Sequence, residues 1–298
     1  MIARSWLLVP GDAEARLTSA GESGAHAIIV DLCEGDGAAD GMAPHSRTIA
    51  RTMGRDWLHA HRRQVLENRR LARWVRVNAI DTGLWRDDLA AVMPTAPDGI
   101  ILPRTAGPDD VRQLAAEIYE LEQRHQVPNG TTRIVPMMGE TPAAALGIAA
   151  YVDFTMPRLA GLGWHSAPLM AAMGAPRTNV AGGGSNDVTR MVRAQALLIA
   201  HARNLWAIEM MDGQGDAAAS LSAAQGARVE GFAGMIARDA GQVAPINAAF
   251  APTSDELANA RAIVGAFAAS PYAERLPVNG RMIDQPRLKA AKALLGVE

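Results

Sequence analysis

Short runs of apolar residues recur along the chain, and segments with helical spacing separate most of them. Continuous runs such as 27–32 and 99–103 are typical of parallel strands that are covered on both faces. Segment 109–123 places apolar residues at helical intervals, and Thr141 with Pro142 offers a helix cap and a first-turn proline. The strand-like runs are 5–9, 27–32, 74–81, 99–103, 133–138, 158–163, 205–209 and 231–237. The alternation predicts an α/β fold.

About eight such units favour a TIM barrel, the (β/α)₈ fold, with a helical C-terminal extension. A doubly wound open sheet would give the same alternation and is the alternative. Beyond Arg238 the pattern changes to helical segments without further strand-like runs. We therefore expect a barrel over residues 1–240 and an extension over 241–298 that packs on the barrel or on a neighbouring subunit.

The expected extension contains clear helix signals. Residues 241–270 are expected to be helical, and Thr253, Asp255 and Glu256 are expected to open one of these helices as a cap and an acidic first turn. Segment 279–286 is expected to be a turn, and 287–295 is expected to be a last amphipathic helix.

Three polar segments of the barrel region need separate interpretation. Asp12 is expected to cap a helix that runs to about Glu22. Segment 45–73 is basic and helical in composition, and we favour a solvated helix face over a contact with an anionic ligand such as a phosphorylated cofactor. The glycines at 182–184 lack the lysine and the spacing of a phosphate loop, so a flexible loop is the better interpretation.

Composition narrows the function classes. The chain has 298 residues, 49% of them hydrophobic, and a net charge of -2, so it can bury a large core and nucleic acid is not an expected partner. Cys33 is the single cysteine, which excludes an internal disulfide and a multi-cysteine zinc site and fits a reducing compartment. No apolar stretch reaches the roughly 20 residues of a membrane span, and the first apolar run ends at Pro10, too early for a signal peptide. We expect a cytoplasmic protein with no membrane partner.

Arg76 is a candidate site residue because it is a permanent charge inside a buried strand. Val75 and Val77 flank it, so a pleated strand would turn Arg76 to one face and both valines to the other. A guanidinium does not lose its proton, and its burial requires a carboxylate or an anionic ligand. Two interpretations stay open. One is an ion pair with a nearby Asp or Glu, which the residues alone favour, and the other is a ligand contact.

Polar residues follow most of the predicted strands. In a TIM barrel the active site lies at the C-terminal ends of the strands. Acidic groups from several strands beside arginines suit a divalent cation together with an anionic substrate. Singly, each carboxylate is more often a helix cap or an ion-pair partner. These strand-end residues are Asp31, Glu34, Asn78, Arg104, Glu140, Trp164 to Ser166, Glu209, Asp212, Arg238 and Asp239.

Several motifs, spread nearly end to end, resemble those of the HpcH/HpaI aldolase and citrate lyase β-subunit family. They are RSWLLVPG at 4–11, GAHAIIVDL at 24–32, VRVNAID at 75–81, DGIILP at 98–103, ET at 140–141, GF at 231–232, QVAPINAAFAPT at 242–253 and GRMIDQP at 280–286. The resemblance implies a (β/α)₈ barrel, often trimeric, that makes or breaks a carbon–carbon bond beside a CoA thioester or a 2-oxo acid. It also implies Mg²⁺ as the cofactor, with Mn²⁺ as the alternative ion.

The resemblance implies roles for individual residues. Arg76 would meet the carbonyl or enolate oxygen of the substrate, and Glu140 would be a direct metal ligand. Asp31 and Glu34, in an acidic loop, would act with Arg76 in catalysis by orienting metal-bound water and substrate. The expected substrate contacts are Arg76, Asn78, Arg104, Pro10 and Gly11. The motif that ends near Asp284 resembles the family's C-terminal element, which can close over the barrel of a neighbouring subunit.

The sequence departs from the family pattern at the metal site. Family members usually carry a second metal carboxylate after the sixth strand, and the alignment places Ser166 there. Ser166 is therefore the expected position of the second metal ligand, but its hydroxyl is a much poorer Mg²⁺ ligand than a carboxylate. Arg104 stands where a lysine is common. His165 is expected to be a hydrogen-bonded structural histidine, in preference to a ligand of a softer metal.

We predict a homo-oligomeric carbon–carbon lyase or aldolase that acts on a CoA thioester of a hydroxy acid, of the citryl-CoA or malyl-CoA type. The alternatives on the same barrel are a 2-oxo acid aldolase and an acyl-CoA thioester hydrolase. A further alternative is a non-catalytic acyl-CoA binding protein in which Ser166 marks a lost metal site. The expected partners are a small acyl-CoA or 2-oxo acid and further copies of the chain.

Overall fold

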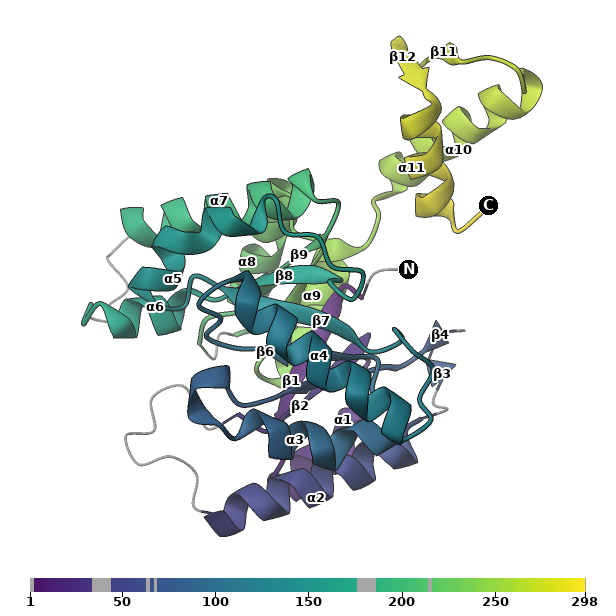
Figure 1. Cartoon of the computed structure of the whole chain (residues 1–298). Helices are drawn as coiled ribbons and strands as arrows, with labels where there is room; N and C mark the ends of the chain where they lie inside the picture. The colour runs from purple at the N-terminus through teal and green to yellow at the C-terminus, as the bar shows by residue number, and fades with distance from the viewer. Residues whose placement is uncertain are drawn as a thin grey trace. The chain divides into compact units, whose positions relative to one another are not determined.

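The computed structural model describes residues 3–33, 44–62, 65–66, 69–175, 186–213 and 216–297. The chain forms two compact units, Ile2–Ala249 and Phe250–Glu298. The larger unit contains a closed barrel of eight parallel strands (Figure 1). The strands, in their order around the barrel, are β1 (Ser5–Pro10), β2 (Ala27–Asp31), β5 (Ala72–Arg76), β6 (Gly99–Leu102), β7 (Arg133–Met138), β8 (Gly161–Trp164), β9 (Trp206–Met210) and β10 (Gly234–Ala237). Because β1 pairs with both β2 and β10, the TIM barrel is confirmed and the open sheet is excluded.

Helices follow the strands and surround the barrel (Figure 1). The predicted cap at Thr141 is confirmed, since its hydroxyl accepts a hydrogen bond from the Ala144 amide at 3.2 Å. The helices of this part of the chain are α1 (Glu14–Ala20), α2 (Pro44–Ala60), α3 (Trp85–Val92), α4 (Pro108–Arg124), α5 (Pro142–Gly147), α6 (Ser166–Ala172), α7 (Asp187–Ala202), α8 (Ala217–Glu230) and α9 (Val243–Phe250). Short 3₁₀ turns are η1 (Ile80–Thr82), η2 (Met93–Thr95), η3 (Ile148–Tyr151) and η4 (Ala240–Gln242).

Two local predictions are wrong. Helix α1 has Ala13 at its N-cap position and no side-chain cap, so Asp12 does not cap it. The basic segment 45–73 is helical only as far as Ala60, where α2 ends. It also contains a two-stranded antiparallel sheet of β3 (Val65–Leu66) and β4 (Arg69–Arg70), and it ends in β5, whose backbone pairs with β2. Strand pairing in the barrel thus overrides the helical composition. The glycines at 182–184 lie outside the described residues.

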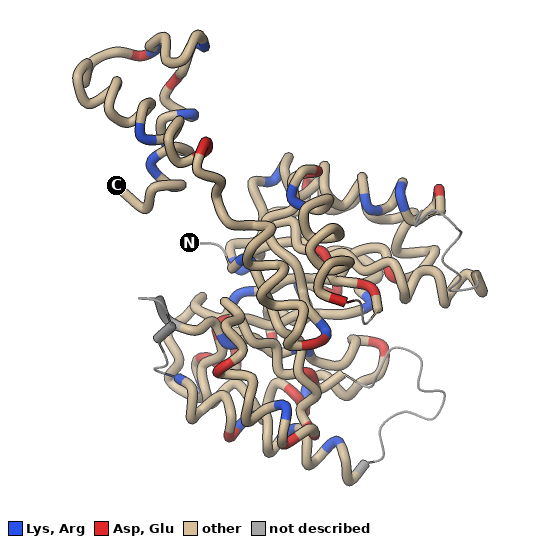
Figure 2. The backbone as a smooth tube through the Cα atoms, turned by 180° about the vertical axis from the view of Figure 1, so that it is seen from behind, with Lys and Arg blue, Asp and Glu red and all other residues tan. Residues whose placement is uncertain are grey.

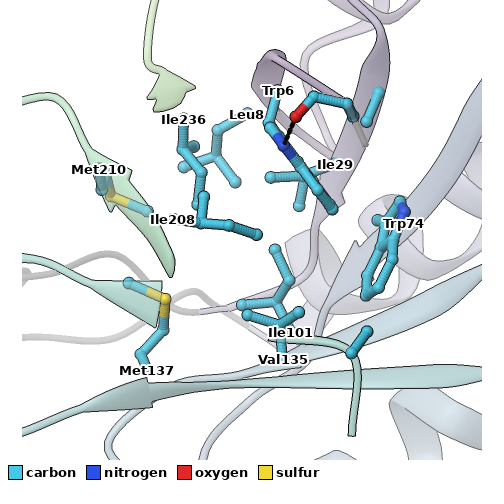
Figure 3. Close-up of a cluster of buried hydrophobic side chains, with 13 residues drawn as sticks. Trp6, Leu8, Ile29, Trp74, Ile101, Val135, Met137, Ile208, Met210 and Ile236 are labelled. Carbon is cyan, nitrogen blue, oxygen red and sulfur yellow. Dashed lines mark hydrogen bonds between the residues drawn. The ribbon is translucent and has the colours of Figure 1, made fainter. Parts of the chain in front are cut away.

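The inside of the barrel is filled by side chains from alternate positions of the strands (Figure 3). Its N-terminal end holds three tryptophans, and the ring centroids of Trp6 and Trp74 are 4.9 Å apart while Trp206 lies within 6.5 Å of both. Gly99 makes room for this cluster, because a Cβ atom there would overlap the indole ring of Trp74. The other inward residues include Leu8, Ile29, Ile101, Val135, Met137, Ile208, Met210 and Ile236. The N-terminal end of the barrel is therefore a packed apolar core.

The smaller unit has its own apolar core and secondary structure. It consists of α10 (Ser254–Ala269), β11 (Arg275–Val278), β12 (Arg281–Asp284) and α11 (Gln285–Leu295). The predicted cap and acidic first turn are confirmed, and Thr253 and Glu256 form a capping box in which each side chain bonds to the other residue's backbone. Segment 279–286 contains more than the expected turn: Asn279 and Gly280 join β11 to β12 in an antiparallel hairpin.

Charged residues of both signs are interspersed along the chain (Figure 2). No helix among the described residues has the length and the apolar character needed to cross a membrane.

Candidate active site

Asp31 and Arg76 lie at the C-terminal mouth of the barrel, which we define as the end where its strands finish. Ile29 and Trp74 belong to the inward-facing core, so the residues two positions further along β2 and β5 share that face. The strand register pairs Asp31 with Arg76 on one side and with Pro10 on the other. Pro10, Asp31 and Arg76, three of the predicted site residues, therefore lie side by side on neighbouring strands at the mouth.

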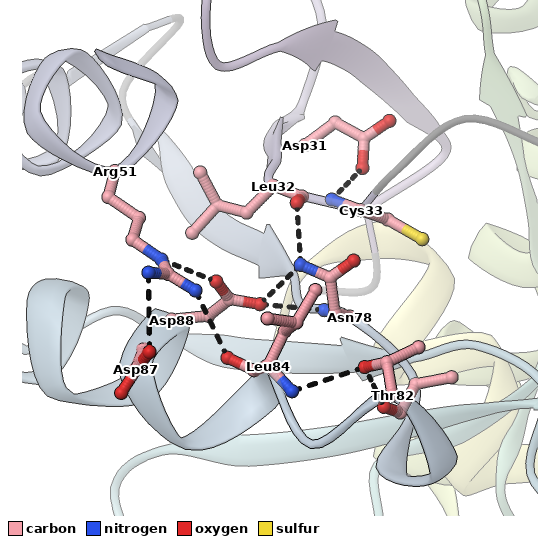
Figure 4. Close-up of polar contacts among 10 residues, drawn as sticks. Asp31, Leu32, Cys33, Arg51, Asn78, Thr82, Leu84, Asp87 and Asp88 are labelled. Atoms are coloured by element: carbon pink, nitrogen blue, oxygen red, sulfur yellow. Dashed lines mark hydrogen bonds and ion pairs between the residues drawn. The ribbon is translucent and has the colours of Figure 1, made fainter. Parts of the chain in front are cut away.

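Arg76 and Asp31 form a two-bonded ion pair. The Nε and Nη2 atoms of Arg76 donate to Oδ1 and Oδ2 of Asp31, each at 2.8 Å. The backbone N–H of Cys33 also donates to Asp31 Oδ1, at 3.1 Å (Figure 4). Both side chains are nearly buried, with 4% of Arg76 and 11% of Asp31 exposed. The ion-pair interpretation of Arg76 is confirmed, and an additional contact with a ligand stays a prediction.

Gly11 approaches Asp31 through its backbone. Its N–H donates to the Asp31 carbonyl oxygen at 2.8 Å. A Cβ atom at position 11 would lie 3.0 Å from the carbonyl oxygens of Asp31 and Ala50, so the close approach favours glycine. Pro10 and Gly11 are thus positioned beside the Arg76–Asp31 pair.

Asn78 is held in a buried network behind the mouth (Figure 4). Its backbone N–H and its Nδ2 atom both donate to Asp88 Oδ2 at 2.8 Å, and Nδ2 also donates to the Leu32 carbonyl at 2.9 Å. Arg51 Nε donates to Asp88 Oδ1 at 2.8 Å. Burial raises the pKa of Asp88, although the hydrogen bonds from Asn78 and Arg51 act in the opposite direction. This network ties the segment after β2 to the segment after β5, and the expected substrate contact of Asn78 stays a prediction.

Glu140 lies just after β7 and is 2% exposed. Its Oε2 atom accepts a hydrogen bond from the backbone N–H of Arg104 at 2.5 Å. Arg104 has a positive φ of 49°, which is uncommon for a residue other than glycine. Its guanidinium turns to Asp81, with Nη2 at 2.6 and 2.5 Å from the two carboxylate oxygens. The backbone N–H of Arg104 thus binds Glu140, and its guanidinium forms an ion pair with Asp81. The sequence did not indicate this role of Asp81.

The ends of β8 and β9 bring together His165, Ser166 and Asp212. Ser166 Oγ donates to Asp212 Oδ2, and His165 Nε2 lies 3.1 Å from Asp212 Oδ1. His165 is fully buried, whereas 57% of the Asp212 side chain is exposed. Glu209, the other carboxylate of this strand, turns outward and pairs with Arg193 of α7. Sequence reasoning placed Asp212 at a strand end, but its contact with Ser166 requires the folded barrel.

Glu140 and Asp212 are candidate ligands of a hard divalent cation. Carboxylates such as Glu140 and Asp212 are the ligands that Mg²⁺ prefers, and Mg²⁺ usually takes one or two of them and keeps several waters. Among the described residues there is no group of three His, Cys, Asp or Glu side chains that could hold a metal ion. Glu34, which was expected to contribute, lies outside the described residues.

Comparison with known proteins identifies the family. The sequence model described as HpcH/HpaI aldolase/citrate lyase matches residues 4–240. The chain belongs to this family. The family resemblance and the lyase class predicted from the sequence are confirmed, and the individual site residues stay predictions.

Relatives in the family are similar over nearly their whole length. A citrate lyase subunit beta-like protein of Mycobacterium tuberculosis is 28% identical over 97% of this chain and 93% of its own. An L-malyl-CoA/beta-methylmalyl-CoA lyase of Cereibacter sphaeroides is 25% identical over 98% of this chain and 93% of its own. The crystal structure of CitE from M. tuberculosis in complex with magnesium, acetoacetate and coenzyme A superimposes with a TM-score of 0.67 at 25% identity, covering 99% of this chain and 97% of that one.

Proposed function

We propose that this chain is a divalent-metal-dependent carbon–carbon lyase that cleaves the CoA thioester of a hydroxy acid, of the citryl-CoA or malyl-CoA type. The observation that carries the proposal is the buried Arg76–Asp31 pair at the C-terminal mouth, at the level of Pro10. A fixed guanidinium at this end of a TIM barrel suits an anionic transition state. Relatives named citrate lyase subunit beta and L-malyl-CoA/beta-methylmalyl-CoA lyase support the substrate class.

The cleavage requires the site to promote loss of the hydroxyl proton and to stabilise the enolate that forms. A base takes the proton of the substrate hydroxyl, which becomes a carbonyl, while the electron pair of the broken carbon–carbon bond moves into the thioester part as an enolate. Protonation of this enolate then gives the acyl-CoA product. Arg76 would donate hydrogen bonds to the thioester oxygen, on which this negative charge develops. Asp31 would hold the guanidinium in place by its two hydrogen bonds of 2.8 Å.

Glu140 would hold the metal ion. When bound, Mg²⁺ or Mn²⁺ would supply a Lewis acid for the oxygens of the released oxo-acid part. A CitE structure of M. tuberculosis contains magnesium with acetoacetate and coenzyme A, which supports a divalent cation in this family. The Arg104 amide fixes one oxygen of Glu140 at 2.5 Å, so the carboxylate is oriented before any ligand arrives.

The test of this function is turnover with and without metal. Purified full-length protein is assayed for cleavage of malyl-CoA and citryl-CoA in Mg²⁺, in Mn²⁺ and after treatment with a chelator. We expect metal-dependent cleavage that is lost in Arg76→Ala and in Glu140→Ala. Glu209→Gln is the matched control, because Glu209 lies on β9 but faces α7. Full turnover in either alanine variant would contradict the residue assignments.

A non-catalytic acyl-CoA binding protein is the second candidate. It is favoured by Ser166, which stands where the alignment expects a metal carboxylate. Calorimetric titration with Mg²⁺, Mn²⁺ and acetyl-CoA distinguishes the two. Tight acetyl-CoA binding in the absence of any metal binding would favour the binding protein over the lyase.

We also propose a homo-oligomer, a trimer by family resemblance, with residues 241–298 as an extension that packs on the barrel or on a neighbouring subunit. Light scattering of the purified protein measures the mass. A mass equal to that of one chain, at concentrations where the protein is active, would overturn the oligomer.

A further inference from the structure

Asp212 lies two residues beyond the C-terminal end of strand β9, at the mouth of the barrel. Ile208 and Met210 of β9 belong to the inward-facing core. Glu209 has the opposite orientation and pairs with Arg193 on the outside of the barrel. Of these two carboxylates, Asp212 is therefore the one that can serve a site at the mouth.

Two residues that follow β8 contact the Asp212 carboxylate from one side, namely Ser166, the first residue of α6, and His165, the N-cap of that helix. Ser166 donates its hydroxyl to Oδ2, and His165 Nε2 lies 3.1 Å from Oδ1. His165 is fully buried, while the Asp212 side chain is 57% exposed and hence accessible to an ion from solvent. Carboxylates that bind metals are commonly oriented by hydrogen bonds from neighbouring groups, and Ser166 makes such a bond to Asp212.

The backbone on both sides of Asp212 is also fixed. The Met211 N–H donates to the Ile236 carbonyl of β10 at 2.9 Å. The Gly213 carbonyl accepts from Gln242 Nε2 at 3.1 Å, and Gln242 is 1% exposed. The carboxylate is thus presented by an anchored strand end, which is what a binding group requires for a defined position.

We propose that Asp212 supplies the carboxylate that Ser166 lacks, so that Glu140 and Asp212 together hold the divalent cation. The inference rests on the proposed function. Strand β8 lies between β7 and β9, so Glu140 and Asp212 reach the mouth from the two strands that flank Ser166. The Asp212 carboxylate accepts a hydrogen bond from the Ser166 hydroxyl. The negative charge expected at position 166 is therefore retained close to that position. Ser166 and His165 act as positioning residues for Asp212.

Metal binding tests the inference without an assay of turnover. Mg²⁺ is titrated calorimetrically into full-length wild type, Asp212→Asn, Glu140→Gln and the control Glu209→Gln. We expect Asp212→Asn and Glu140→Gln each to weaken Mg²⁺ binding by more than about tenfold. Glu209→Gln removes one negative charge from the same strand but should bind Mg²⁺ as the wild type does. A rise of the unfolding temperature with Mg²⁺ provides a second readout, because an ion that binds the folded state stabilises it.

A charge swap separates a ligand role from a structural one. Asp212→Ser should lose Mg²⁺ affinity, and adding Ser166→Asp to it should restore most of that affinity, since a carboxylate and a hydroxyl then exchange places. Mg²⁺ affinity of Asp212→Asn within about twofold of wild type would overturn the inference. If Glu140→Gln alone weakened binding, the proposed function would stand without Asp212. If the wild type bound neither Mg²⁺ nor Mn²⁺, the inference and the proposed metal-dependent function would both be contradicted.

Discussion

Two buried arginine–carboxylate pairs lie at opposite ends of the barrel. At the N-terminal end, Arg158 precedes β8 and pairs with Glu122 of α4. Glu122 accepts four hydrogen bonds, two from Arg158 and one each from the backbone N–H groups of Gly130 and Thr132. With about four acceptor positions on a carboxylate, this set is complete within the protein. The pair serves the fold of the loop that leads into β7.

The pair at the C-terminal mouth is similar in chemistry but different in surroundings. Asp31 accepts two hydrogen bonds from Arg76 and one from the Cys33 amide. Around it lie groups expected to serve a ligand, with Glu140 and Asp212 on the other side of the mouth. The comparison teaches that burial and pairing alone do not distinguish a structural arginine from a site arginine. The two roles are distinguished by the end of the barrel at which the pair lies and by the groups that surround it.

The largest effect is expected when the N-terminal pair is broken. Arg158→Ala leaves the fully buried Glu122 carboxylate without its charged partner, which should lower the free energy of unfolding by about 3–5 kcal/mol. Denaturant unfolding measures this change. Turnover per folded molecule should stay at the wild-type value, and a selective loss of turnover at unchanged stability would reverse the assignment of the two ends.

Replacing both members of each pair by apolar residues sharpens the comparison. Asp31→Leu with Arg76→Met should lower turnover by about 100-fold or more, because the charge proposed to stabilise the developing enolate is removed. Glu122→Leu with Arg158→Met should leave turnover unchanged. Stability should change little in either double variant, since a well-packed apolar pair can substitute for a buried ion pair. Equal turnover in the two double variants would remove the distinction.

A smaller effect is expected at the tryptophan cluster. Gly99→Ala places a methyl group against Trp74 and should cost about 1–3 kcal/mol of unfolding free energy through overpacking. The Mg²⁺ affinity should not change, because the cluster lies at the end of the barrel away from the mouth. Gly226→Ala is the control, since a Cβ atom at that position meets nothing within 4 Å.

The smallest effect is expected on the free energy of unfolding at acidic pH. Burial raises the pKa of Glu122, but hydrogen bonds from Arg158, Gly130 and Thr132 outweigh it, so the pKa is lowered overall. The folded state then binds this proton less readily than the unfolded state. The resulting stability is present above the ordinary glutamate pKa of about 4.3 and is lost as the pH falls through the folded-state pKa. Unfolding free energies between neutral and acidic pH should fall more steeply for wild type than for Glu122→Gln.

Much of the fold could be predicted from the sequence because its signals are local. Continuous apolar runs such as 27–32 and 99–103 indicate strands of a parallel barrel wherever they occur, and capping residues such as Thr141 and Thr253 act within a few positions of themselves. Strands β3 and β4 are two residues long and carry no such pattern, so the composition of the basic segment 45–73 indicates only a helix.

The site could be predicted only as a set of residues. Arg76 and Asp31 were both candidates, but their pairing depends on the register of β5 against β2. The contact between Ser166 and Asp212 likewise joins residues 46 positions apart. Such pairings arise from closure of the barrel, which the pattern along one segment does not encode.

The hydrogen bond that orients Glu140 comes from the backbone of Arg104. A backbone N–H is present in every residue except proline, so this support does not depend on which side chain occupies position 104. The side chain there is therefore available for change during evolution, and a different residue could alter contacts at the rim of the mouth while the carboxylate beneath it kept its amide donor. The side-chain contacts of position 104 and the orientation of Glu140 are in this way separable within a single residue.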